Sequence, residues 1–489
     1  MLRLSVTECA IAMLADVRGA EGRAEEIEVA GVSIDTRTLK AGELYIAIRG
    51  EHYDGHTFVD KAVEAGAAAL VLEEPVSTDL PQLIVADTRD ALTALAQNWF
   101  ERHQIQTVAI TGSNGKTTVK EIIATILRQL GPVLATRGNL NNDIGVPLTM
   151  LELNQQHRYA VIEMGASKAG DIRQLVSIVK PEVAVITSIA AAHLEGFGSV
   201  EGVATAKAEL FLGLSNDGWA VFNADGEYAA TLREAARHCH VRDFGVNSGV
   251  DVRGIAGSGM HIETCGRQLK PRFRLVGDHN GLNALAAVAA VQCLDVQSPT
   301  IMLGLEAVRA IPGRLESKSG LLGSTIIDDS YNANPASTRV AIELLAELQG
   351  KRHLVLGDMA ELGPDAAELH AEAGRLARRR GIDGLWTTGE LSKSASTAFH
   401  KPASLAPSGL ATGVVKLETV DAPVAEGPES RRRRGGHFDD HLALLDALHQ
   451  ELAANSTVLV KGSRSAHMER VVAALLVTAS ESKSSEVMS

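Results

Sequence analysis

The sequence predicts an α/β protein of three successive domains, built mainly from parallel sheets. Short apolar runs of strand character alternate with segments of helical periodicity along the chain. Near-continuous apolar strands separated by helices are typical of a parallel sheet covered on both faces. The length of 489 residues exceeds what one hydrophobic core supports and favours about three domains.

Residues 1–102 form the first predicted domain. Strand-like runs at 43–48 and 69–72 alternate with helical segments at 58–65 and 91–100. This alternation predicts a small α/β module that ends just before the next apolar strand.

The second predicted domain, residues 103–312, begins with the most informative motif of the chain. Residues 111–118 read Thr-Gly-Ser-Asn-Gly-Lys-Thr-Thr, between an apolar run at 108–110 and a helical segment at 119–127. A strand, a Gly-rich turn and a helix start form a phosphate cradle, because backbone N–H groups and the helix dipole face the anion. The motif therefore predicts a site for a nucleoside triphosphate.

Two side chains of this motif have predicted roles of their own. Lys116 would place a charge on the β- and γ-phosphates, and the Thr117 hydroxyl could ligate Mg²⁺. Ile110 stands where the strict pattern has another Gly, so this is a variant P-loop. A Gly-Lys-Thr turn can also precede a helix by chance, but the flanking strand and helix argue against chance. Further strands are predicted at 159–163, 183–187 and 219–223.

Residues 313–489 form the third predicted domain, again α/β. Its strands are predicted at 325–328, 353–357 and 457–461. A Pro/Ser/Ala-rich stretch at about 400–436 ends in Arg431–Arg434. We expect a disordered surface insertion there, and a basic docking tag is the alternative.

Composition excludes several classes of protein. The net charge of -13 argues against a general binder of nucleic acid or membrane surfaces, since both need a basic face. The four cysteines are scattered without metal-ligand spacing, which favours free thiols in a reducing compartment. The apolar patch at 10–15 is too short for a membrane span, and Glu8 and Asp16 bracket it. We therefore expect a cytoplasmic protein.

Several polar residues follow predicted strands or open predicted helices. Glu163 ends a strand near the P-loop and is placed to hold Mg²⁺, although a solvated strand-end Glu is the alternative. His193 follows a third strand and could meet a second ion or be structural. Asn280 and Asn283 share a helix face, which could be simple capping. The polar loop at 328–335 follows a strand, as ligand-binding loops do.

Taken together, these segments resemble the Mur ligase family of ATP-dependent amide-forming enzymes in peptidoglycan precursor synthesis. The variant P-loop is that family's version, which folylpolyglutamate synthetases share. The other motifs that carry the resemblance lie at 136–149, 163–167, 192–198, 329–335, 356–363 and 461–464. The resemblance extends from about Ser33 to about Val472.

The resemblance implies an N-terminal domain that holds the UDP end of a substrate, a central ATPase and a C-terminal Rossmann-like domain. It implies ATP and Mg²⁺ as cofactors, UDP-MurNAc-tripeptide and D-alanyl-D-alanine as small-molecule partners, and no nucleic acid or stable membrane association. The substrate carboxylate would form an acyl phosphate, from which the amine displaces phosphate. A monomer is the default expectation.

The resemblance also implies roles for individual residues. Lys116, Glu163, His193 and Lys207 would be catalytic. Metal ligands would be Thr117, Glu163, His193 and Lys207, the last as a carbamate. Nucleotide contacts would come from Gly112, Ser113, Asn114, Gly115, Lys116, Thr117, Thr118, Asn280, Asn283, Arg314, Asp329, Asn332 and Asn334. Substrate contacts would come from Ser33, Asp35, Arg37, Asp54, His56, Asn139, Asn142 and Thr149.

Two departures and three alternatives accompany these expectations, and one departure is the insertion at about 400–436, which is longer than the family pattern leads us to expect. Ser188 stands where Asn is expected before the His, which puts that residue's contribution in question. Another family member with a different amine, a P-loop nucleotide switch and a catalytically dead scaffold are the alternatives. The third residue of the tripeptide stays open between meso-diaminopimelate and L-lysine.

Overall fold

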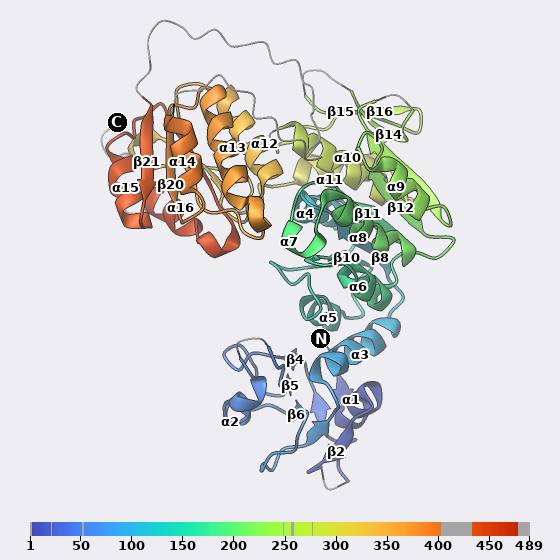
Figure 1. Cartoon of the computed structure of the whole chain (residues 1–489). Helices are drawn as coiled ribbons and strands as arrows, with labels where there is room; N and C mark the ends of the chain where they lie inside the picture. The colour runs from blue at the N-terminus through green and yellow to red at the C-terminus, as the bar shows by residue number, and fades with distance from the viewer. Residues whose placement is uncertain are drawn as a thin grey trace, which may run out of the picture. The chain divides into compact units, whose positions relative to one another are not determined.

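The computed structural model describes residues 2–20, 22–50, 53–247, 249–255, 259–275, 277–401 and 433–477. Their contacts define two compact units. The first holds residues up to Ala190 together with Gly196–Val308, and the second holds Ala191–Glu195 and the chain from Arg309 on. Both are α/β with largely parallel sheets, as the sequence predicts (Figure 1).

The N-terminal part of the first unit contains a five-stranded sheet in the order β2-β7-β6-β5-β4. Strands β4 to β7 are parallel, β2 is antiparallel to β7, and β1 pairs with β3 separately. The elements are β1 (Leu4–Ser5), α1 (Val6–Met13), β2 (Asp16–Arg18), β3 (Glu28–Val29), β4 (Val32–Ser33), β5 (Leu44–Ile46), η1 (Gly55–Phe58), α2 (Val59–Glu64), β6 (Ala69–Leu72), β7 (Gln82–Ile84) and α3 (Thr88–Glu101).

The rest of the first unit is built on a nine-stranded sheet in the order β16-β15-β14-β13-β12-β11-β8-β10-β9, parallel from β9 to β14. Its first elements are β8 (Gln106–Thr111), α4 (Lys116–Leu127), β9 (Val133–Ala135), α5 (Gly145–Leu151), β10 (Tyr159–Glu163), α6 (Asp171–Val179), β11 (Val183–Ile186), α7 (Leu194–Phe197) and α8 (Val200–Leu212). Then come β12 (Trp219–Asn223), α9 (Ala229–Ala235), β13 (His240–Gly245), β14 (Val252–Ile255), β15 (His261–Thr264), β16 (Arg267–Leu269), α10 (Asp278–Gln292) and α11 (Ser298–Ala307).

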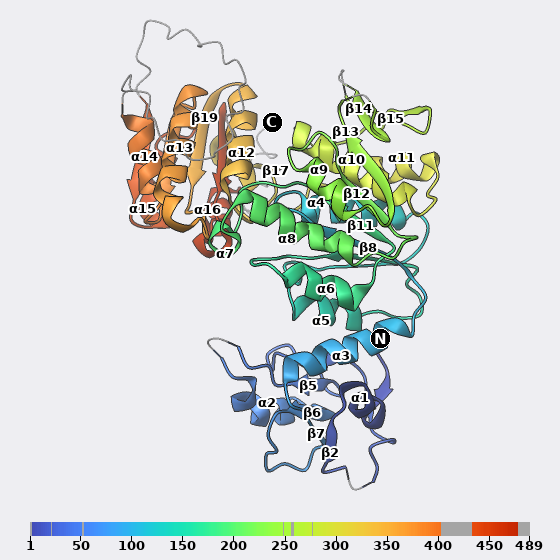
Figure 2. The same cartoon turned by 45° about the vertical axis from the view of Figure 1, so that its right-hand side comes forward.

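The strands of this sheet carry apolar side chains on both faces, and successive residues of one strand pack into different hydrophobic cores. Val108 and Ile110 of β8 pack with α4, α10 and α11, whereas Ala109 between them packs with α5, α6 and α8. This follows from the two-residue period of a strand. Helices on both faces are also visible in Figure 2. The burial explains why these strands read as continuous apolar runs.

The second unit contains a six-stranded sheet in the order β17-β18-β22-β19-β20-β21, parallel except for β17. Helices α12, α13 and α14 pack on one face, and α15 and α16 on the other. The elements are β17 (Glu316–Ser319), η2 (Leu321–Gly323), β18 (Thr325–Asp329), α12 (Pro335–Glu347), β19 (Lys351–Leu356), η3 (Gly363–Asp365), α13 (Ala366–Arg379), β20 (Gly384–Thr388), α14 (Lys393–His400), β21 (Arg434–Phe438), α15 (His441–His449), β22 (Ser456–Lys461), η4 (Arg464–Ala466) and α16 (Glu469–Leu475).

The predicted end of the insertion, at about residue 436, lies too far along the chain. Residues 402–432, which include Arg431 and Arg432, lie outside the described residues, but 434–436 belong to β21, which pairs with β20. The first residues of this strand, Arg-Gly-Gly, carry no apolar side chains that would predict a strand. Backbone pairing with β20 defines the strand here. Gly435 has φ +95, and a side chain there would collide with the backbone of Leu385.

Candidate active site

The Gly-rich turn lies at the edge of the central sheet where the carboxyl ends of β8, β10 and β11 meet. Strand β8 lies between the other two, and such an edge is where open α/β sheets bind ligands. The turn joins β8 to α4, whose first residue is Lys116. Gly115 has φ +83, and a side chain there would run into Asn283 of α10. The motif thus has the strand, turn and helix start that a phosphate cradle requires.

Thr117 and Glu163 are joined directly. The Thr117 hydroxyl donates to Glu163 Oε2 at 2.8 Å, and the Asn141 amide donates to Oε1 at 2.9 Å. The N–H of Glu163 donates to the Thr136 hydroxyl at 2.9 Å, so its backbone is oriented as well. A hydroxyl and a carboxylate are ligands that Mg²⁺ accepts together with substrate phosphates. Within the described part of the chain, no three His, Cys, Asp or Glu side chains converge.

The segment after β11 holds the turn from another side. The Ser113 N–H donates to the Ser188 carbonyl at 2.8 Å, and the Ser113 hydroxyl donates to the Ala190 carbonyl at 2.9 Å. The Asn114 N–H donates to Ser188 Oγ at 3.0 Å, and that hydroxyl donates to the Asn114 carbonyl at 3.1 Å. Ser188, the departure from the expected pattern, is therefore a direct support of the turn.

Lys116 and Lys207 occupy different environments. Lys116 Nζ donates to the Gly112 carbonyl at 2.7 Å, which keeps its ammonium over the turn. Lys207 of α8 is 2 % exposed, and its Nζ lies 5.9 Å from the centre of the Phe197 ring. Burial lowers the pKa of Lys207 well below its usual value, and the charge of Lys116 lowers this pKa further.

The remaining predicted nucleotide residues of the first unit lie on α4 and α10. Thr118 is buried in the first turn of α4. Asn283 borders Gly115 and donates through Nδ2 to Asn280 Oδ1 at 3.2 Å. The structure thus brings Asn283, hydrogen-bonded to Asn280, against the P-loop turn.

In the second unit, Asp329 and Lys461 form a buried pair. Lys461 Nζ donates to Asp329 Oδ2 at 2.5 Å and to the Asn332 carbonyl at 3.0 Å. Burial raises the pKa of Asp329, while Lys461 and Arg314 act in the opposite direction. The Arg314 guanidinium lies 4.3 Å from the centre of the Tyr331 ring. Of the predicted nucleotide residues, Asp329 thus belongs to this pair, and Arg314 and Asn332 lie next to it.

Asn334 and His193 also make contacts in the second unit. Asn334 caps α12, since its Oδ1 accepts the Ser337 N–H at 2.9 Å. His193 has φ +51 and contacts the Glu361 carboxylate through Nδ1. Its segment, Ala191–Glu195, belongs to the second unit, whereas Thr117 and Glu163 belong to the first.

The predicted substrate residues of the N-terminal part form two clusters, of which the first follows β4. Ser33 Oγ donates to the Asp35 carbonyl at 3.1 Å. The Arg37 guanidinium binds both carboxylate oxygens of Asp35, at 2.9 Å from Nε and 2.6 Å from Nη2. This hydrogen-bonded pairing lowers the pKa of Asp35.

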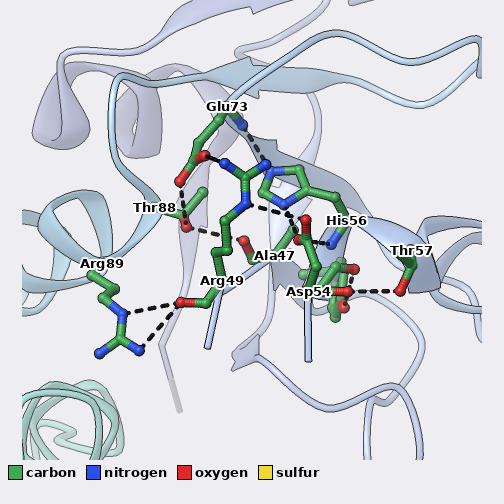
Figure 3. A network of polar contacts seen from close by, with 10 residues as sticks. Ala47, Arg49, Asp54, His56, Thr57, Glu73, Thr88 and Arg89 are labelled. Carbon is green, nitrogen blue, oxygen red and sulfur yellow. Dashed lines mark hydrogen bonds and ion pairs between the residues drawn. The ribbon is translucent and has the colours of Figure 1, made fainter. Parts of the chain in front are cut away.

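The second cluster surrounds Asp54 and His56 (Figure 3). His56 Nε2 accepts the Glu73 N–H at 3.0 Å, so Nδ1 carries the proton that is shared with Asp54 at 2.7 Å. Arg49 bridges the two carboxylates, at 3.1 Å from Asp54 and 2.7 Å from Glu73. The pKa of Asp54 is lowered, first by the hydrogen bond from the His56 backbone N–H and second by the hydrogen bond from the His56 ring.

The Asn-rich loop at 138–144 leads into α5. Asn142 Oδ1 accepts the N–H of Gly145, the first residue of α5, at 2.9 Å. The Asn139 carbonyl accepts the Asn141 N–H at 2.8 Å. Thr149 is buried, and its hydroxyl donates to the Gly145 carbonyl at 2.8 Å. These contacts show what shapes the loop.

Three family models match successive parts of the chain. They are described as "Mur ligase family, catalytic domain" over residues 28–100, "Mur ligase middle domain" over 110–291 and "Mur ligase, glutamate ligase domain" over 313–464. Together they cover most of the sequence. The chain belongs to the Mur ligase family.

Named relatives of this Mur ligase match it over nearly its whole length. The UDP-N-acetylmuramoyl-tripeptide–D-alanyl-D-alanine ligase of Escherichia coli strain K12 is 40% identical over 96% of this chain and 98% of its own. A crystal structure of MurF from Acinetobacter baumannii has a TM-score of 0.85 at 32% identity and covers 97% of this chain and 99% of its own. MurF ligase from Thermotoga maritima in complex with ADP has a TM-score of 0.75 at 27% identity, over 91% and 96% of the two chains.

Sequence reasoning gave no role to several residues that contact the candidate site residues of this Mur ligase. Asn141 binds Glu163, Lys461 binds Asp329, and Arg49 bridges two carboxylates. Lys461 is the last residue of an apolar strand, and this position could have marked it as a candidate site residue. Asn141 and Arg49 lack such a signal, because their partners come from other strands and loops. In the part of the chain that the structure describes, no helix is long and apolar enough to cross a bilayer.

Proposed function

We propose that this protein is an ATP-dependent ligase that joins D-alanyl-D-alanine to UDP-N-acetylmuramoyl-tripeptide and releases ADP and phosphate. The observation that carries this proposal is the 40% identity to the Escherichia coli ligase of that name over 96% of the chain. The activity belongs to peptidoglycan precursor synthesis, and so to cell wall biogenesis, cell shape and cell division.

The proposed reaction has two steps. A carboxylate oxygen of the tripeptide attacks the γ-phosphorus of ATP, the bond to the bridging oxygen of ADP breaks, and an acyl phosphate forms. The amine of D-alanyl-D-alanine then attacks the acyl carbon, and the tetrahedral intermediate loses phosphate while the nitrogen gives up a proton. Phosphoryl transfer depends on positioning and charge neutralisation. Lys116, whose ammonium lies over the turn, supports both requirements.

The proposed metal is Mg²⁺, which would neutralise phosphate charge. The side-chain oxygens of Thr117 and Glu163 would suit such an ion as ligands, because they lie 2.8 Å apart and are buried at the sheet edge. His193 is proposed for a second ion. Lys207 would contribute as a carbamate: its neutral amine adds to the carbon of CO₂, loses a proton and becomes a carboxylate-like ligand. Burial favours the neutral amine with which this step begins.

Substrate contacts complete the proposal. The proposed UDP-side residues are Ser33, Asp35, Arg37, Asp54 and His56, and the proposed muramyl-peptide residues are Asn139, Asn142 and Thr149. Nucleotide contacts are proposed for the turn 112–118 and for Asn280, Asn283, Arg314, Asp329, Asn332 and Asn334. We also propose domains at 1–102, 103–312 and 313–489, a monomer, and a cytoplasmic location where UDP-linked precursors are made.

The test is phosphate release from Mg²⁺-ATP with UDP-MurNAc-tripeptide, with and without D-alanyl-D-alanine. Release that needs both substrates supports the ligase and the acyl-phosphate route. Release that ignores D-alanyl-D-alanine but responds to another amine would reassign the chain to a sister ligase. Release that responds to neither substrate would favour a nucleotide switch.

A further inference from the structure

The side chain of Arg89, in the first turn of α3, reaches two other segments. Asp87 caps α3 by accepting the N–H groups of Arg89 and Asp90 at 2.7 and 3.0 Å. The Arg89 guanidinium donates to the Arg49 carbonyl at 3.4 Å from Nε and 3.2 Å from Nη2 (Figure 3). Its Nη1 donates to Asp143 Oδ2 at 2.7 Å. One side chain therefore joins the Asp54–His56 cluster of the N-terminal part to the Asn-rich loop.

The same loop is tied to the P-loop edge only two residues earlier. The Asn141 amide donates to Glu163 at 2.9 Å, and the Asn141 carbonyl accepts the Gly165 N–H at 2.7 Å. Asn142, between the two contacts, accepts the N–H of Gly145 at the start of α5. The loop is thus held by Glu163 on one side and by Arg89 on the other.

A second contact between α3 and the segment after α5 does not depend on Arg89. Trp99 Nε1, near the end of α3, donates to the Leu153 carbonyl at 3.0 Å, and α3 also packs in the core that contains α5. Loss of the Arg89 contact should therefore leave the two helices packed. What it would change is the position of the loop relative to the N-terminal part.

We infer that Arg89 and Asp143 form a positioning pair that sets the Asn-rich loop for the UDP-linked substrate. This inference rests on the proposed function, because the loop and the Asp54–His56 cluster are its substrate-contacting segments. The pair does not touch the nucleotide residues, so it should govern the KM for the UDP-linked substrate and leave the KM for ATP unchanged.

The test is a charge swap. Arg89→Glu places two carboxylates together, and we expect the KM for UDP-MurNAc-tripeptide to rise about tenfold, with the KM for ATP changed less than about twofold. Asp143→Arg should have a similar effect. The double variant restores opposite charges, and its KM should return to within about threefold of the original.

Arg102→Glu is the matched control. Arg102 lies at the end of the same helix and pairs with Glu8 at 3.0 Å, with side-chain exposures of 39% and 44% against 38% and 37% for Arg89 and Asp143. We expect this variant to keep both KM values. If Arg89→Glu behaves like the control, or if the double variant shows no recovery, the inference is wrong. Absence of D-alanyl-D-alanine-dependent phosphate release in the unaltered protein would instead overturn the proposed function.

Discussion

Lys207 of the first unit and Lys461 of the second are both almost fully buried, at 2 % and 1 % exposure. Lys461 donates to the Asp329 carboxylate and to a carbonyl, so its charge has partners. Lys207 lies over an aromatic ring with Lys116 as its charged neighbour. A buried lysine with a carboxylate partner cross-links the fold, whereas burial beside a like charge favours the neutral, reactive amine.

The comparison predicts the largest effect at Lys207. Lys207→Ala should lower phosphate release on the order of a thousandfold, as loss of a transition-state stabilising group does, without unfolding the protein. A short carboxylic acid that fills the vacated space should restore part of the activity. Lys207→Arg, which keeps the charge but does not form a carbamate, should not be active. Full activity of Lys207→Ala would contradict the ligand role.

Lys461→Ala should instead destabilise the second unit. Removing one partner of a buried pair leaves an uncompensated charge and costs about 3–5 kcal/mol of the free energy of unfolding. Urea unfolding of the full chain measures this. The exposed pair Lys180–Glu101, joined at 2.8 Å, is the control, and Lys180→Ala should cost less than about 1 kcal/mol. Equal losses in the two variants would remove the distinction between the pairs.

His353 extends the comparison to a base that burial keeps neutral. It is buried in β19, its Nδ1 accepts the Trp386 Nε1–H at 3.3 Å, and burial lowers its pKa to about 4. The unfolded chain, with a His pKa of about 6.5, binds more protons between these values. Stability is therefore complete above about pH 6.5 and falls by about 3 kcal/mol as the pH approaches 4.

Unfolding by urea at several pH values checks the His353 prediction. His353→Gln does not titrate in this range, so the decline in its free energy of unfolding should be smaller by about that amount. An unchanged decline would show that other groups, such as His370 with its lowered pKa, account for it.

The smallest predicted effect concerns Ser188, which supports the P-loop turn through two hydrogen bonds. Ser188→Ala should raise the KM for ATP about fivefold, because a hydrogen bond contributes about 1 kcal/mol, and leave the KM for the UDP-linked substrate unchanged. Ser177→Ala, on the exposed side of α6, is the control. An unchanged KM for ATP in Ser188→Ala would show that the turn keeps its form without this hydroxyl.

Much of the fold was predictable because its signals are local. The parallel strands are continuous apolar runs, and the P-loop turn needs glycine at Gly115, so both are visible in the sequence. The Arg-Gly-Gly start of β21 was missed, since backbone pairing with β20 rather than side-chain character defines it. Of the candidate site residues, Lys116, Thr117 and Glu163 could be proposed from the sequence, because they lie at or just after the ends of apolar strands.

The sequence by itself determined the α/β class, the phosphate-cradle motif and the residue types available for a metal and a nucleotide, because periodicity and short motifs depend on near neighbours. Only the tertiary structure decided which lysine has a carboxylate, that Asn141 meets Glu163, and that Arg89 joins Arg49 to Asp143. These contacts link residues from 22 to 132 positions apart. Packing of whole helices and strands, not the local sequence, brings such partners together.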